Sequence, residues 1–189
     1  MSMTSTPPTT DAEDRRILVA LALALVEQPR ASLQELSRAI GISKATLYRF
    51  CRTRQALIDR LATHSGQVLD EVITSARLDS APPLDALRQL IASHLEHREL
   101  TVFLMYYWKD ASTDICAHCE WDKALDAFFL RGQQAGVFRI DISAPGLTEI
   151  FISTLIGLFD AERRGRVARV GLAALIESAF LDGTRTQKP

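Results

Sequence analysis

Apolar residues recur every three or four positions along almost the whole chain from residue 11 onward. This spacing gathers the apolar side chains on one side of each successive helix, and no stretch shows the strict alternation of a half-buried strand. The pattern therefore predicts an all-α protein of about nine helices. The expected helices cover residues 11–27, 33–40, 44–50, 54–77, 84–98, 100–108, 112–135, 145–163 and 167–182.

Capping signals near the N-terminus mark two short helices. Ser32 is followed three residues later by Glu35, a capping box that opens the first of them, and Gly41 can adopt the left-handed conformation that ends it. Ser43 then caps the second short helix. Two short helices joined by a tight glycine turn form a helix-turn-helix unit, whose second helix is shaped to enter the major groove of DNA.

The charge distribution supports this interpretation, although the net charge does not. The formal net charge is -1, and hydrophobic residues make up 47% and charged residues 24% of the chain, as in ordinary globular proteins. Between residues 30 and 60, however, basic residues outnumber acidic ones, which gives one end of the protein an attraction to phosphates. A solvated surface that merely happens to be basic is the alternative. The basic residues are Arg30, Arg38, Lys44, Arg49, Arg52, Arg54 and Arg60, against Glu35 and Asp59.

A longer string of residues makes the interpretation more specific. Residues 32–57, SLQELSRAIGISKATLYRFCRTRQAL, resemble the DNA-binding signature of the TetR family of transcriptional regulators. Residues 130–139, LRGQQAGVFR, resemble the family's approach to its dimerisation helices. The chain departs from the family where Cys51 and Arg52 replace the usual aromatic residue and proline, and where the loop before Ser32 lacks a Gly-Tyr pair. These departures concern the tilt of the recognition helix.

The resemblance implies a division of the chain into domains and a function. It implies a three-helix, helix-turn-helix DNA-binding domain over residues 11–53 and a helical ligand-binding and dimerisation domain over residues 54–189, with helix 54–77 as the connector. Residues 1–10, rich in Ser, Thr and Pro, are expected to form a disordered tail. The function implied is that of a repressor that binds a palindromic operator in double-stranded DNA as a homodimer and is released by a small-molecule effector.

Six residues are candidates for DNA contacts by their positions in the family signature. Lys44 and Thr46 are expected at base edges or nearby phosphates, and Tyr48 and Arg54 at phosphates. Arg49 either reads a guanine or neutralises a phosphate. For Tyr48, the alternative is a structural ring packed between helices. The full set is Ser43, Lys44, Thr46, Tyr48, Arg49 and Arg54.

The larger aromatic residues and the histidines are concentrated between residues 84 and 130. Ligand pockets between bundle helices are built from such residues, because they are mostly apolar with a few hydrogen-bonding groups. We therefore expect a cavity for an apolar or aromatic effector; the alternative is a filled core with hydrogen-bonded histidines. The candidate lining residues are His94, His97, Phe103, Tyr106, Tyr107, Trp108, Trp121 and Phe128.

The three cysteines, Cys51, Cys116 and Cys119, do not form a secreted disulfide framework. Cys116, His118 and Cys119 make a Cys-x-x-Cys pattern that is typical of thiol or metal sensing, which is the alternative to an apolar effector. No second metal-binding knuckle accompanies it, so we assign no metal and no cofactor. A small helical enzyme is a further alternative. The sequence lacks a Gly-rich phosphate loop and a nucleophile elbow, so we expect no enzyme.

The last two expected helices, residues 145–163 and 167–182, are too apolar to be covered on one side only. Burial in a twofold four-helix bundle with a second subunit is the natural solution, and it matches a palindromic operator. The chain shows neither a signal peptide nor an uninterrupted membrane-spanning run, so we expect a cytoplasmic protein without membrane contact. The candidate dimerisation residues are Phe151, Leu155, Leu158, Gly171, Ala174 and Ser178.

Overall fold

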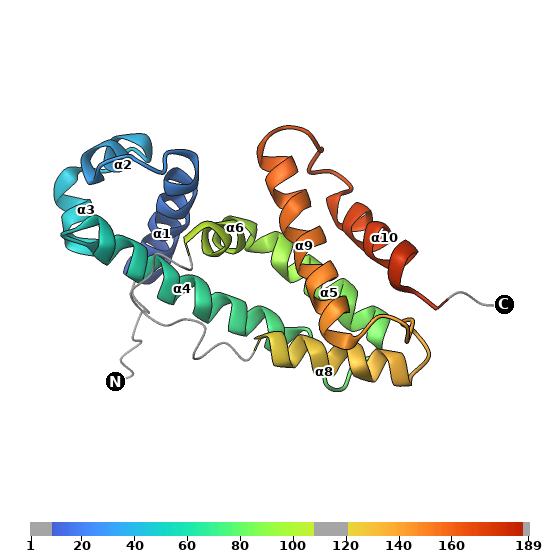
Figure 1. Cartoon of the computed structure of the whole chain (residues 1–189). Helices are drawn as coiled ribbons and strands as arrows, with labels where there is room; N and C mark the ends of the chain where they lie inside the picture. Colours follow the sequence, from blue (N-terminus) through green and yellow to red (C-terminus); the bar gives the residue numbers. More distant parts are fainter. Residues whose placement is uncertain (1–8, 108–120, 187–189) are drawn as a thin grey trace, which may run out of the picture.

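The computed structural model describes residues 9–107 and 121–186. Within these residues the protein is all-α and has nine helices, which confirms the predicted fold class (Figure 1). Trp108, Cys116, His118 and Cys119 lie outside the described residues. The helices are α1 (Thr9–Glu27), α2 (Leu33–Ala39), α3 (Lys44–Phe50), α4 (Arg54–Ser75), α5 (Pro83–Glu96), α6 (Arg98–Tyr107), α8 (Trp121–Gln134), α9 (Ala144–Arg163) and α10 (Leu172–Thr184).

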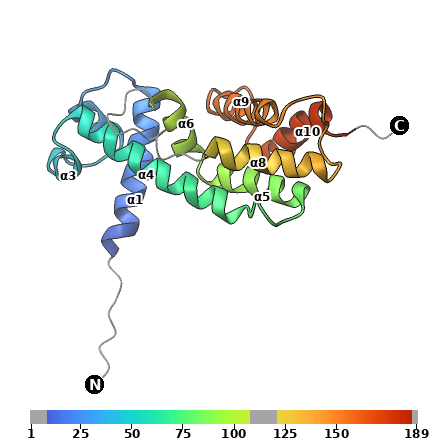
Figure 2. The ribbon, with the colours of Figure 1, turned by 60° about the horizontal axis from the view of Figure 1, so that its bottom comes forward.

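The helices form a small end and a larger end, which α4 connects. α1, α2 and α3 gather at the small end, and α4 runs from them along the molecule (Figure 1). At the larger end α9 and α10 lie side by side (Figure 2), with α9 packed against α8 and α10 against α5. α6 lies between the two ends, because it contacts α1 and α4 as well as α9.

The predicted capping signals at the small end are confirmed. The Ser32 hydroxyl accepts a hydrogen bond from the backbone N–H of Glu35 at 3.3 Å, and the Glu35 carboxylate accepts one from the backbone N–H of Ser32 at 2.7 Å. The backbone N–H and the hydroxyl of Ser32 both donate to this carboxylate and hold the pKa of Glu35 below its usual value. Gly41 has a φ of 73°, the left-handed conformation that lets α2 end and the chain turn into α3.

The small end has its own buried apolar centre, which continues into the rest of the core. Leu21 and Leu25 of α1, Leu36 of α2 and Leu47 of α3 are all fully buried there. Burying an aliphatic side chain of this size stabilises a fold by about 1.5–3 kcal/mol. These leucines therefore fix the inner side of α3 and leave its outer side to the solvent.

A cluster of phenylalanine rings forms the centre of the larger end, with ring centroids between 4.9 and 6.2 Å apart. Gly132 of α8 lies directly against one of these rings. A Cβ atom at this position would come within 2.3 Å of the Phe138 ring, so only glycine fits without displacing it. The rings of the cluster are Phe128, Phe129, Phe138, Phe151 and Phe180.

Several helix boundaries differ from the expected ones, and three of them concern predicted sites or the expected tail. α10 begins at Leu172 and not at residue 167, because Gly171 takes a left-handed φ of 84° immediately before it. Gly171 therefore precedes the helix and is not part of its small-residue face. α1 begins at Thr9, inside the stretch expected to be a tail. His97 is the C-cap residue after α5 and does not continue the buried stripe of that helix.

Among the described helices, α9 alone is long and apolar enough to cross a membrane by length and composition. It packs against α8, α10 and α6, and it buries Phe151, Leu155 and Phe159 on that side. Its other side stays open in the single subunit: Ile150 is 39% exposed, and nothing lies within 4 Å of a Cβ atom built on Gly157. A second molecular surface can therefore approach α9 from that side.

Candidate DNA-binding surface, ligand groove and dimer face

The outward side of α3 carries five of the six residues predicted to contact DNA. Leu47 and Phe50 of this helix are buried. The side chains on the other side are exposed or half-exposed, so the helix presents a polar, basic surface to the solvent. These side chains are Ser43, Lys44, Thr46, Tyr48 and Arg49.

Ser43 and Thr46 form the start of this surface. The Ser43 hydroxyl accepts a hydrogen bond from the backbone N–H of Thr46 at 3.0 Å, which makes Ser43 the N-cap of α3. Its Oγ atom also lies 2.8 Å from the Thr46 Oγ1 atom. The two hydroxyls thus stand together at the N-terminus of the helix, where backbone N–H groups favour an anion such as a phosphate.

The cationic side chains of α3 are only weakly engaged within the subunit. The Lys44 Nζ atom lies 5.3 Å from the centroid of the Tyr48 ring. The Arg49 guanidinium lies 3.7 Å from an oxygen of Asp14, while its side chain is 67% exposed. Asp14 Oδ1 is buried and has no hydrogen-bond partner among the described residues, and at 3.7 Å the guanidinium does not donate a hydrogen bond to it. The Tyr48 ring is 42% exposed and is not buried between helices as the alternative required.

Arg54, the sixth predicted DNA contact, is engaged inside the protein. One of its guanidinium N–H groups donates to the backbone carbonyl of Pro29 at 2.6 Å, and the guanidinium carbon lies 5.9 Å from the centroid of the Tyr107 ring. Arg54 therefore ties the start of α4 to the loop after α1. A phosphate contact by Arg54 would compete with this hydrogen bond. The neighbouring Arg52 is exposed to the solvent.

Tyr107 was expected to line the ligand cavity, but its polar group is directed elsewhere. The buried hydroxyl donates to the backbone carbonyl of Leu25 at 2.8 Å, and the ring stacks on Phe103 with centroids 5.0 Å apart. Both rings are core residues, so this part of the expectation is corrected. Tyr107 instead joins the end of α6 to α1, and with Arg54 it holds the small end against the rest of the molecule.

The other predicted ligand residues are spread over separate environments. Phe128 belongs to the phenylalanine cluster. Tyr106 is exposed, and its hydroxyl donates a hydrogen bond to the Asp160 carboxylate at 3.2 Å. The Trp121 indole N–H donates to the Asp70 carboxylate at 2.6 Å, which connects the start of α8 to α4. His94 is buried, as expected for the inner stripe of α5.

A groove of about 660 Å³ lies between the end of α4 and α8. This volume is within the roughly 300–1,000 Å³ typical of small-molecule pockets. Phe128 is the predicted ligand residue that lines it. Arg131 borders the groove while its guanidinium donates to the backbone carbonyls of Leu78 and Ala81, which holds the chain after α4 in place. The lining residues are Ile73, Thr74, Arg77, Leu78, Asp79, Ser80, Ala124, Ala127, Phe128 and Arg131.

The neighbouring helices α9 and α10 carry small and apolar residues on their exposed sides, which are together called the dimer face below. Phe151 and Leu155, predicted for the dimer interface, are buried in the core of their own subunit, so they are not part of this face. Leu158 is half-buried, and Ala174 and Ser178 are exposed. The dimer face comprises Ile150, Ser153, Thr154, Gly157, Leu158, Ala174, Leu175 and Ser178.

Comparisons with known proteins agree with this architecture. No protein-family model matches the chain. The sequence is 50% identical over 178 residues to the HTH-type transcriptional regulator NfxB of Pseudomonas aeruginosa, an alignment that covers 91% of this chain and 94% of NfxB. It is 32% identical over 92 residues to the HTH-type transcriptional repressor LfrR of Mycolicibacterium smegmatis, covering 49% of each protein.

Solved structures show the same fold. The TetR-like transcriptional regulator LfrR from Mycobacterium smegmatis, in complex with proflavine, matches with a TM-score of 0.71 and 23% identity, covering 93% of this chain and 98% of that one. The TetR-family regulator PfmR from Thermus thermophilus matches with a TM-score of 0.68 and 23% identity, covering 89% and 98%. The chain belongs to the TetR family of transcriptional regulators.

For this TetR-family chain, the sequence signature singled out the exposed residues of α3 but not the residues of the groove. The groove residues Ile73, Leu78 and Arg131 were missed, because they follow or face the end of α4 and carry no motif. Gly157 of the dimer face was not singled out either. The apolar composition of α9 indicated that a second subunit covers this helix, but it did not show which side of the helix faces outward.

Of the cysteines of this TetR-family protein, Cys51 lies within the described residues, and it is not part of the Cys-x-x-Cys pattern. Cys51 is buried at the end of α3, where burial raises the pKa of its thiol. Cys116, His118 and Cys119 lie outside the described residues. Within residues 9–107 and 121–186, no three His, Cys, Asp or Glu side chains are grouped to hold a metal ion.

His94 is a buried histidine of α5, and it gives the stability a pH dependence. Its Nδ1 atom lies 3.4 Å from the Thr101 hydroxyl. Burial, with a smaller repulsion from His97, lowers the pKa of His94 from 6.5 to about 4. The unfolded chain therefore binds the proton first as the pH falls. The contribution of His94 to stability is complete above its unfolded pKa and is lost as the pH falls towards 4.

We expect this loss to be measurable by denaturant unfolding at several pH values. Between about pH 8 and about pH 5, His94 should lower the free energy of unfolding by about 2 kcal/mol. His94→Gln keeps a polar group near Thr101 but cannot titrate, so it should remove that part of the fall. A variant whose stability falls with pH as steeply as that of the wild type would contradict this assignment.

Proposed function

We propose that this TetR-family chain is a cytoplasmic repressor that binds a palindromic operator as a homodimer and leaves it when a small apolar or aromatic effector binds. In this proposal residues 11–53, which include α2, α3 and most of α1, form the reading domain, and α4 connects it to the ligand-binding and dimerisation domain. The observation that carries the proposal is the outward surface of α3. Its inner side is fixed by buried leucines, and its outer side displays hydroxyls and cations.

The DNA-binding part of the proposal rests on what this surface can recognise. An arginine such as Arg49 can donate two hydrogen bonds to a guanine edge in the major groove. Lys44 and the hydroxyl groups at the start of α3 are suited to phosphates. Arg49 is 67% exposed and lies 3.7 Å from Asp14, so it can turn to DNA without breaking a hydrogen bond.

The part of the proposal that concerns dimerisation rests on the dimer face. Gly157 of α9 and Ala174 of α10 lie on it, and small residues let two helix pairs approach closely. A twofold axis through this face would bury the exposed apolar side chains Ile150 and Leu175. The same axis would relate two copies of α3, so the operator would contain two half-sites in inverted orientation.

The effector part of the proposal rests on the groove beside α4. An occupant of this groove would touch the end of α4, whose other end begins at the reading domain. The hydrogen bond from Trp121 to Asp70 connects the neighbouring start of α8 to the same helix. The fold relative LfrR is described in complex with proflavine, a planar aromatic amine. Such a compound belongs to the class of effector expected from the aromatic residues of this chain.

We expect proflavine to release the chain from its operator, and Trp121→Phe to make this release harder. The variant keeps an aromatic ring but loses the hydrogen bond to Asp70, a bond to a charged group worth about 1.5–3 kcal/mol. Because effector binding and α4 are coupled through this region, the proflavine concentration for half-release should rise about tenfold. Operator affinity without proflavine should change little. Fluorescence anisotropy of labelled operator measures both quantities.

A double variant, Cys116→Ser with Cys119→Ser, serves as the control for this experiment. We expect it to respond to proflavine as the wild type does. If Trp121→Phe responded normally while the double cysteine variant lost its response, the effector assignment would be wrong, and thiol or metal sensing would replace it.

A further inference from the structure

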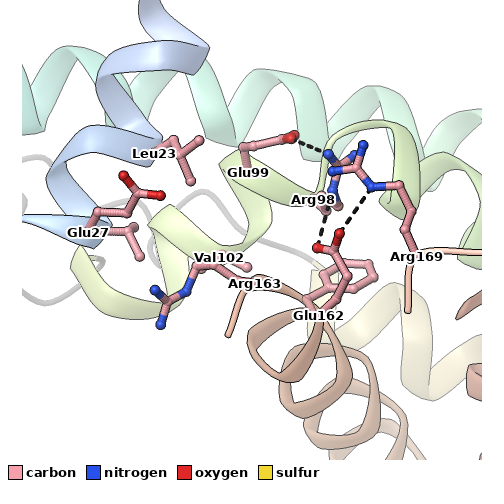
Figure 3. A pocket seen from close by; sticks show the side chains of 10 residues that line it. Leu23, Glu27, Arg98, Glu99, Val102, Glu162, Arg163 and Arg169 are labelled. Carbon is pink, nitrogen blue, oxygen red and sulfur yellow. Dashed lines mark hydrogen bonds and ion pairs between the residues drawn. The ribbon is translucent and has the colours of Figure 1, made fainter. Parts of the chain in front are cut away.

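A second, smaller cavity lies between the reading domain and the helices behind it (Figure 3). Its volume is about 210 Å³, and its walls come from α1, α6, α9 and the segment after α9. It is separate from the groove between α4 and α8, with which it shares no lining residue. The lining residues are Leu23, Val26, Glu27, Arg98, Glu99, Val102, Phe159, Glu162, Arg163 and Arg169.

Most charged groups of this cavity neutralise one another. Arg98 lies 2.6 Å from Glu99 and 3.7 Å from Glu162. Arg169 lies 3.0 Å from Glu162, so four charged residues form one connected cluster on one side of the cavity (Figure 3). The fifth, Arg163, donates to Asp160 at 2.7 Å just outside the lining. All three arginines of the cavity therefore contact carboxylates, although Arg163 shares Asp160 with Arg164.

Glu27 is the charged group that remains. It stands apart from the ion-pair cluster, on the α1 side of the cavity (Figure 3), and has no hydrogen bond or ion pair with any residue of the described ranges 9–107 and 121–186. Glu27 is also the last residue of α1, whose final turn contains no basic residue. The free carbonyl groups at the end of a helix add negative potential there. Glu27, which is exposed to solvent, is thus the carboxylate of this lining that is left without a cationic partner among the described residues.

The rest of the lining is apolar. Leu23 and Val26 of α1 face the cavity beside Val102 of α6, and Phe159 of α9 completes this wall. The volume of about 210 Å³ is below the roughly 300–1,000 Å³ of pockets for drug-sized molecules. The cavity therefore suits a compact ligand with one charged group and a short apolar or single-ring body.

We propose that this cavity is a second effector site, which binds a small organic monocation with its ammonium or amidinium group at Glu27 and its apolar body against Leu23 and Val102. The regulatory part of this proposal rests on the proposed function. Since α1 belongs to the reading domain and α6 and α9 do not, an occupant touches both parts at once. Any change in their relative position changes the site, so cation binding and operator binding are linked.

Calorimetric titration of the DNA-free protein with benzylammonium tests the site directly. We expect benzylammonium to bind at least tenfold more tightly than benzyl alcohol, which has the same ring and no charge. Glu27→Gln should weaken benzylammonium binding about tenfold and leave the weak binding of benzyl alcohol unchanged. Leu23→Trp, which fills the cavity from a half-exposed position, should abolish both.

Glu13→Gln is the matched control, because Glu13 is an exposed glutamate near the other end of α1. It should bind benzylammonium as the wild type does. The site is refuted if benzylammonium fails to bind, if Glu27→Gln binds it normally, or if Leu23→Trp still binds it while unfolding at the wild-type temperature.

A separate titration of labelled operator distinguishes this inference from the proposed function. Saturating benzylammonium should change the operator dissociation constant of the wild type at least threefold and that of Glu27→Gln not at all. A chain that binds benzylammonium through Glu27 but no operator would refute the proposed function alone. A chain that binds its operator and responds to proflavine, yet ignores benzylammonium in both titrations, would refute this second site alone.

Discussion

Placing a carboxylate on the dimer face by Ala174→Glu is expected to yield monomers that bind the operator at least about 100-fold more weakly. Ala174 is exposed in the single subunit, so the substitution leaves the subunit core intact. In a dimer that buries α9 and α10, however, the new charge would be desolvated without a partner, which is costly. A monomer then loses the gain from engaging two linked half-sites. Sedimentation velocity and operator titration measure the two effects.

Ala92→Glu provides the control, because Ala92 is an exposed alanine on α5, away from this face. It should remain dimeric and bind the operator normally. Leu155→Glu is not a suitable test, since Leu155 is 2% exposed and its replacement would damage the subunit itself. An Ala174→Glu protein that sediments as an intact dimer would place the interface elsewhere.

The second large effect is expected at the reading surface. Arg49→Ala should weaken binding to the selected operator by about 1–3 kcal/mol, roughly 5- to 150-fold, and relax the preference for one base pair in each half-site. The reason is that an arginine that reads a guanine contributes to specificity as well as to affinity. Titrations against operator variants with each base pair replaced in turn measure this loss of preference.

Arg166→Ala removes the same charge from an exposed arginine between α9 and α10. It should leave both affinity and base preference nearly unchanged. If Arg49→Ala weakened binding to all operator variants equally, Arg49 would be a phosphate contact. If neither variant differed from the wild type, α3 would not be the reading helix.

Features that depend on near neighbours in the sequence can be predicted well for this chain. The capping box of Ser32 and Glu35 and the cap at Ser43 join residues three positions apart. The left-handed turn at Gly41 requires a residue without a Cβ atom, and only glycine meets this requirement easily. The position and outward face of α3 follow from these short-range signals together with the apolar period.

Contacts between distant segments are not predictable in the same way. Tyr107 donates to the backbone of Leu25, 82 positions away, and Arg54 to that of Pro29, 25 positions away. A phenol hydroxyl serves equally well in a ligand pocket, and a guanidinium serves equally well at a phosphate. Residue type therefore limits the possible partners but does not choose among them. Both side chains were predicted to contact a ligand or DNA, whereas in the structure each joins two distant segments of the chain.

The dimer face illustrates a different limit. α9 is apolar around most of its circumference, so its hydrophobic period does not separate the side that faces the subunit core from the side that faces outward. Phe151 and Leu155 fill the core, while Ile150 and Gly157 remain outside. Only the packing of α8 and α10 against α9 decides between these sides.

Selection of bound duplexes from a random DNA pool tests the central claim most directly, because the protein itself chooses the operator sequence from all those present. The purified chain should enrich a palindrome whose two half-sites are separated by about one helical turn of DNA or a multiple of it. Binding to this sequence should be at least about 1,000-fold tighter than to unrelated DNA at the same salt concentration. Recovery of no common sequence, or binding that depends on salt but not on sequence, would contradict the account.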